Sequence, residues 1–125
     1  MNYKTFLSEN GKYAVCEVTG VITEENALEF TEASNQLIHA ANVRRLLTDV
    51  RNASNKLDVL ENYSYAYDSM GDLNLRKDIR TAILVDKNDR SHDFMETVAL
   101  NAGYNVRIFR DKEAAISWLN EDMPY

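Results

Sequence analysis

The chain has 125 residues, which fits one domain, residues 1–125, with a core large enough to need no disulfide or metal. Its net charge of −6 would repel a phosphate backbone, so we expect no nucleic-acid partner. No apolar stretch reaches the roughly 18 residues of a membrane span, so we expect no transmembrane segment. The lone Cys16 cannot form an internal disulfide, which favours a cytoplasmic location.

Five segments have strand patterns, and we predict strands near residues 2–8, 12–19, 44–50, 79–85 and 105–110. Asn10 and Gly11 join the first two as a predicted two-residue hairpin turn. The third and fourth are continuous apolar runs such as "RRLLTDV", which is typical of buried parallel strands. We therefore predict a mixed, mostly parallel five-stranded sheet in chain order, with only the first strand antiparallel.

Four predicted helices separate these strands, and each has a capping signal. Thr23 precedes the first helix, and Asp58 with Glu61 forms a predicted capping box for the second, which runs through about residue 70. Asp89 or Ser91 is expected to cap the third helix, and Asp111 the last. The order β-β-α-β-α-β-α-β-α indicates a single α/β domain.

Four stretches resemble the STAS-like, or SpoIIAA-like, family of anti-sigma-factor antagonists, nearest to its small uncharacterised bacterial members. They are "VTGVITEENALEF", "RRLLTDVRNAS", "IRTAILVDKND" and "NVRIFRDKEAAISWL", which together extend from Val18 to Leu119. The resemblance implies a five-stranded mixed sheet with packed helices, and a protein that works by binding. It also connects the chain to lipid-carrying SEC14-type domains, which are larger.

In the antagonists, a serine after the central strand is phosphorylated to switch partner binding. The matching segment here is "DVRNASNKLD", which lacks the family's adjacent Ser-Ser and its glycine. Ser54 is the nearest hydroxyl, so the resemblance implies Ser54 as a phosphorylation site.

Two aspartates follow the apolar runs of the third and fourth predicted strands. If those strands are parallel neighbours, Asp49 and Asp86 approach the same rim, where open α/β sheets place ligands. One interpretation is a magnesium site or a phospho-acceptor pocket, in which Arg51 also binds an anion. The other is that each aspartate accepts backbone N–H groups of its own loop or pairs with Arg51 or Lys87.

Three tyrosines, Tyr63, Tyr65 and Tyr67, lie in the predicted second helix. They line a pocket or a partner surface in one interpretation. In the other, Leu60, Tyr63 and Tyr67 pack on the sheet and Tyr65 is exposed. If a ligand site exists, we expect Asp49, Arg51, Ser54 and Asp86 to converge beneath this tyrosine helix.

The sequence has no nucleophile elbow, zinc pattern or glycine-rich phosphate loop, so we expect no catalytic residues, metal or cofactor. The leading hypothesis is a non-enzymatic STAS-like regulatory module that acts through protein–protein contacts, either with a partner or by self-association. The alternative is a carrier of a small apolar or amphipathic ligand. A weaker alternative is an enzyme that uses Asp49 and Asp86.

Overall fold

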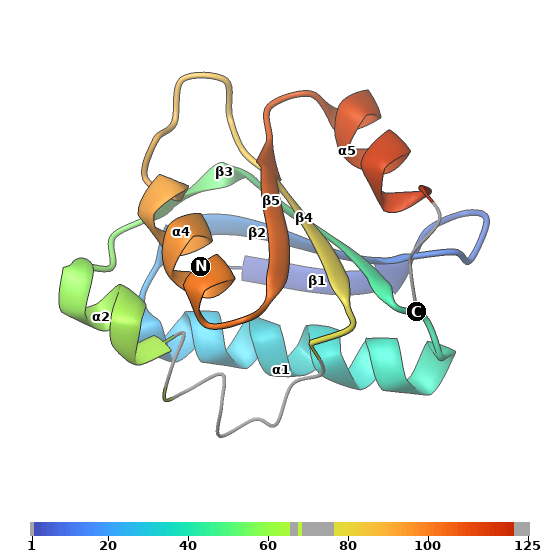
Figure 1. The fold of residues 1–125 in the computed structure, drawn as a ribbon, viewed down its shortest axis with the longest axis horizontal. Helices are drawn as coiled ribbons and strands as arrows, with labels where there is room; N and C mark the ends of the chain where they lie inside the picture. Colours follow the sequence, from blue (N-terminus) through green and yellow to red (C-terminus); the bar gives the residue numbers. More distant parts are fainter. Residues whose placement is uncertain (1, 66–67, 69–76, 122–125) are drawn as a thin grey trace.

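The computed structural model describes residues 2–65, 68 and 77–121 (Figure 1). Along the chain its elements alternate as the sequence predicts. They are β1 (Asn2–Leu7), β2 (Ala14–Ile22), α1 (Glu24–Ala41), β3 (Arg45–Asn55), α2 (Val59–Ser64), β4 (Arg80–Leu84), α4 (Asp93–Asn101), β5 (Asn105–Phe109) and α5 (Lys112–Leu119). The predicted second helix was to run through residue 70, and residues 66–67 and 69–70 lie outside the described part.

The sheet confirms the predicted topology. Its order is β1-β2-β3-β4-β5, with β1 antiparallel to β2 and every other neighbouring pair parallel. The predicted hairpin turn is wrong in length, because β1 ends at Leu7 and β2 begins at Ala14. Ser8 donates its N–H to the carbonyl of Tyr13, so residues 8–13 form a wider loop in which Gly11 has a φ of 71°.

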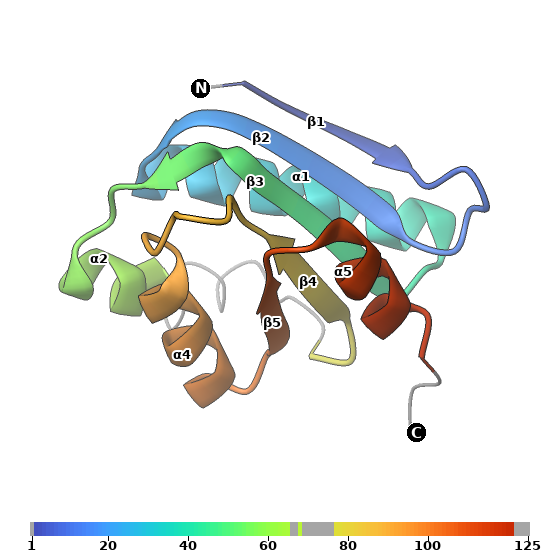
Figure 2. The ribbon, with the colours of Figure 1, turned by 90° about the horizontal axis from the view of Figure 1, so that it is seen from above.

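Two hydrophobic cores lie on opposite faces of the sheet, as the alternation along β2 predicts. Cys16 and Val18 belong to the core covered by α1 and α4, whereas Tyr13 and Val15 belong to the core covered by α5. In Figure 2, α1 lies behind β2 and β3 and α5 lies in front of the sheet. Each strand therefore presents one set of side chains to α1 and the alternate set to the α5 side.

Local capping signals explain where three of the helices begin. Thr23 accepts the N–H of Asn26 before α1, the Asp58–Glu61 capping box is present before α2, and Asp111 accepts the N–H of Ala114 before α5. The predicted cap of α4, Asp89 or Ser91, was wrong, because the N-cap is His92, which makes no side-chain capping bond. Ser91 instead accepts the backbone N–H of Asn55 at 3.0 Å, which ties the start of α4 to β3.

β3 is longer than predicted, because the polar residues after Asp49 belong to the strand. The strand continues to Asn55 because Asn52 and Ser54 pair with Thr19 and Val21 of β2. The register shifts by one residue between the Glu17–Asp49 and Thr19–Asn52 pairs, so β3 contains a β-bulge. The segment after Asp49 is therefore a bulged strand paired on one side, and not the predicted loop.

Candidate functional site

The two faces of β3 border two different hollows in the surface. Leu46, Thr48 and Val50 face a cavity on the α1 side of the sheet, whereas Asp49 and Arg51 face a groove on the α5 side. The alternation of side chains in a strand explains this division. The structure thus separates the charged residues from the tyrosine-bearing segment, which the sequence had led us to expect at a single rim.

Asp49 and Arg51 form a closed pair on the α5 side. The Arg51 Nε lies 3.0 Å from Asp49 Oδ1 and its Nη2 lies 2.8 Å from Oδ2, and the Arg51 backbone N–H also donates to Oδ1 at 3.1 Å. Burial alone would raise the pKa of Asp49, but the hydrogen bonds from Arg51 outweigh it and hold this pKa below its ordinary value. Asp49 is therefore an ionised carboxylate that is satisfied by its own strand.

This pair lies in an open groove of about 700 Å³, which we call the α5-side groove. Its lining includes Phe6, Tyr13, Val15, Asp49, Arg51 and Ile116. The ring of Phe6 is exposed, at 39%, and the Arg51 side chain is 44% exposed. The groove thus presents an exposed aromatic ring and an exposed guanidinium within the same lining.

Asp86 and Ser54 do not join this pair into one site. Asp86 is exposed after the end of β4, and its Oδ2 accepts the N–H of Asn88 at 3.1 Å, which closes its own turn. Ser54 is half-buried within β3 and lies before Asp58, the N-cap of α2. Of the four charged or hydroxyl residues expected at the rim, only Asp49 and Arg51 are in contact with each other.

The segment that contains the tyrosines is not oriented as the second interpretation expected, in which Leu60 packs on the sheet and Tyr65 is exposed. Tyr65 is only 7% exposed, whereas Leu60, which was expected to pack inward, is 79% exposed. The reason is Asn62, a buried residue whose amide donates to the carbonyls of Leu57 and Asp58 and so turns this side of the helix inward. The side chain of Tyr63 and the whole of Tyr67 lie outside the described part.

Tyr65 reaches across to α1. Its hydroxyl shares a hydrogen bond with that of Thr31 and donates to the carbonyl of Ala27 at 3.4 Å. Burial raises the pKa of Tyr65 to about 12, so this phenol is neutral at neutral pH.

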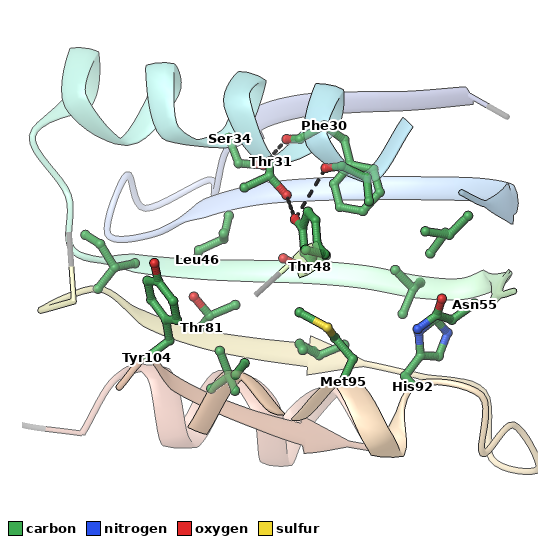
Figure 3. Close-up of a pocket in the computed structure, with 18 of the residues that line it drawn as sticks. Phe30, Thr31, Ser34, Leu46, Thr48, Asn55, Thr81, His92, Met95 and Tyr104 are labelled. Atoms are coloured by element: carbon green, nitrogen blue, oxygen red, sulfur yellow. Dashed lines mark hydrogen bonds between the residues drawn. The ribbon is translucent and has the colours of Figure 1, made fainter. Parts of the chain in front are cut away.

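The cavity beside Tyr65 has a volume of about 160 Å³, and we call it the α1–α4 cavity. Leu46, Thr48, Thr81 and Ile83 form its floor. Its walls come mainly from α1, through side chains such as Phe30, and from α4, through side chains such as Met95 (Figure 3). The lining is mostly apolar, as in sites that bind small molecules.

His92 closes one end of this cavity (Figure 3). It is 5% exposed, and its Nε2 lies 3.3 Å from the carbonyl of Ala53 and 3.4 Å from the carboxylate of Asp89. Burial lowers the pKa of His92 in spite of these acceptors, so the imidazole is neutral at neutral pH. Sequence analysis did not identify His92 as a cavity residue, because its contacts come from a strand far away in the sequence.

Residues 2–65, 68 and 77–121 contain no group of three or more His, Cys, Asp or Glu side chains that could hold a metal ion. Within the same part of the chain, no helix has the length and apolar character needed to cross a membrane.

Comparison with known proteins agrees with this fold. The chain is similar to an uncharacterised DUF3478-family protein from Shewanella loihica with a SpoIIAA-like fold, at 18% identity and a TM-score of 0.58 over 94% of this chain and 92% of that one. It is also similar to the anti-sigma factor antagonist SpoIIAA in its unphosphorylated form, at 16% identity and a TM-score of 0.57 over 97% of this chain and 100% of that one. No curated protein gives a significant match.

These likenesses place the chain in the class of SpoIIAA-like α/β domains, as its sheet order and helix arrangement require. The family model described as SpoIIAA-like matches residues 14–120. The chain therefore belongs to the SpoIIAA-like family, which confirms the resemblance found in the sequence.

Proposed function

We propose that this protein is a non-enzymatic regulatory module that acts by binding a protein partner. The α5-side groove is the observation that carries the proposal, because it combines an exposed Phe6 with the Arg51 guanidinium. Aromatic and arginine side chains are enriched at the energetic centres of protein interfaces. Membership of the SpoIIAA-like family supports the proposal, since the related SpoIIAA is an anti-sigma factor antagonist.

The Asp49–Arg51 pair is suited to recognition. It presents the guanidinium in one fixed orientation, so a partner can use the remaining N–H donors of Arg51. The same pairing argues against the enzymatic alternative, because the Asp49 carboxylate is occupied and Asp86 closes a separate turn.

The test is site-specific photo-crosslinking in the native cells. A photoreactive residue replaces Glu9 at the edge of the groove, and the matched control replaces Leu100, which is 50% exposed on α4. We expect a discrete cross-linked product from position 9 that disappears when Arg51→Gln is added, and none from position 100. Equal products from both positions, or none from position 9, would reject the groove as the partner site.

A second candidate function, a carrier of a small apolar ligand, is favoured by the α1–α4 cavity. Its volume of about 160 Å³ and its apolar lining fit a small molecule, although they do not fit a lipid tail. Native mass spectrometry of freshly purified protein tests this function through any retained mass. A cavity-filling variant, Ala99→Leu, should lose that mass, because Ala99 is buried in the lining.

A further inference from the structure

Several polar side chains around the α1–α4 cavity already have partners in the protein. The Tyr65 hydroxyl bonds Thr31, the Ser34 Oγ donates to the carbonyl of Phe30 at 2.8 Å, and His92 bonds the carbonyl of Ala53. The hydrogen-bonding groups of these three side chains are used within the fold.

Thr48 and Thr81 belong to the described lining side chains without such a partner. Both stand on the floor of the cavity, on adjacent strands, with Thr48 opposite Ile83 and Thr81 opposite Leu46 (Figure 3). Among the described residues, neither hydroxyl has a hydrogen-bond partner. Valine has the same shape without the hydroxyl and is common in buried parallel strands. Both threonines are half-buried and line the cavity, so their hydroxyls can bond a polar group of a molecule placed there.

The described lining of the cavity carries no formal charge. No Asp, Glu, Lys or Arg is part of its described lining, and its titratable residues are Tyr65, His92 and Tyr104. Burial raises the pKa of both tyrosines and lowers that of His92, so all three are uncharged at neutral pH. The Lys77 ammonium lies 5.2 Å from the ring centroid of Tyr104, outside this lining. A charged group placed against these described residues would therefore lose its hydration without gaining a counter-ion from them.

We propose that the α1–α4 cavity binds a neutral, mainly apolar molecule of about one ring, whose single hydroxyl or carbonyl group bonds Thr48 and Thr81. This inference rests on the carrier function proposed above and adds the chemical class of the ligand. The size follows from the volume of about 160 Å³, since an apolar cavity of about 150 Å³ in an engineered protein holds one benzene molecule.

The test is a methyl NMR titration of the whole chain with three probes of similar size: phenol, toluene and benzoate. We expect phenol to shift the methyl signals of Ala27 and Ala99, which line the cavity, and to bind more tightly than toluene and benzoate. The double substitution Thr48→Val and Thr81→Val should weaken phenol about three- to tenfold, the effect of losing one or two neutral hydrogen bonds, and leave toluene unchanged. The matched control, Thr97→Val on the exposed side of α4, should bind phenol like the wild type.

The possible failures are distinguishable. Equal binding of phenol and toluene, with no effect of the valine substitutions, would overturn the role of the two threonines while leaving a carrier function in place. Benzoate binding more tightly than phenol would overturn the neutral ligand class. If none of the probes shifts a cavity methyl signal, the carrier function itself is wrong. The single valine variants replace the double variant if the latter does not give a folded spectrum.

Discussion

Replacing Tyr65 with phenylalanine tests the link between α1 and the segment that follows α2. The substitution keeps the buried ring and removes only the hydroxyl that bonds Thr31 and the carbonyl of Ala27. No cavity is created, so the cost is the loss of these two hydrogen bonds, which leaves the half-buried Thr31 hydroxyl without this partner. We expect a loss of about 1–2 kcal/mol in the free energy of unfolding.

Urea unfolding followed by the fluorescence of Trp118, the single tryptophan, measures this loss. A double-mutant cycle with Thr31→Val isolates the bond and should give a coupling energy of about 1 kcal/mol. Tyr13→Phe is the matched control, because Tyr13 is also buried and its hydroxyl has no hydrogen-bond partner in the described part of the chain. A coupling energy near zero, or equal losses for Tyr65→Phe and Tyr13→Phe, would refute the reasoning.

The raised pKa of Tyr65 also predicts how the stability of the protein changes at alkaline pH. The pKa of Tyr65 is about 12 in the folded protein and about 10 in the unfolded chain. Its contribution to the free energy of unfolding is therefore complete below pH 10 and is lost as the pH rises towards 12. At pH 11 the wild type should have lost about 1.4 kcal/mol from this residue. Tyr65→Phe should lack this part of the pH dependence, and parallel pH profiles for the two proteins would contradict the burial of the phenol.

Three further predictions concern other local interactions. Arg51→Gln should raise the pKa of Asp49 towards or above its ordinary value, as measured by NMR titration of the carboxyl group, because burial is then opposed by fewer hydrogen bonds. Its cost in stability should stay below about 1 kcal/mol, since Arg51 is largely exposed. Asp111→Ala should cost about 1 kcal/mol in urea unfolding through loss of the α5 cap, whereas Asp111→Ser should retain most of the stability. We also propose Ser54 as a phosphorylation site: phosphate-affinity gels of protein from the native cells should show a slower band that Ser54→Ala removes, and a band that persists in this variant would exclude Ser54.

The elements of the fold could be predicted because their signals are local. Thr23, Asp58 and Asp111 precede their helices and accept N–H groups three residues further on, so a short stretch of sequence contains both donor and acceptor. The apolar runs of β3 and β4 likewise contain enough information to identify buried parallel strands as neighbours. Sheet order then followed from the short connections between elements.

The orientation of the second helix could not be predicted in this way. Counting only apolar residues selected Leu60 as an inward position, whereas the buried Asn62 faces inward together with Tyr65. A buried amide is stable there because its N–H groups donate to carbonyls in the turn before it. The periodicity of apolar residues does not reveal such hydrogen bonds.

The division of the expected site into two has a related cause. Asp49 and Arg51 lie two residues apart in an extended strand, so they share the α5 side, and the bulge then lets β3 continue past the end of β4. The cavity on the other face needs Phe30 from α1 and Met95 from α4, whose proximity is a property of the tertiary fold. A single strand thus supplies charged side chains to one surface and threonine hydroxyls to another, and partner binding and ligand binding can be separated experimentally by substitutions at neighbouring positions.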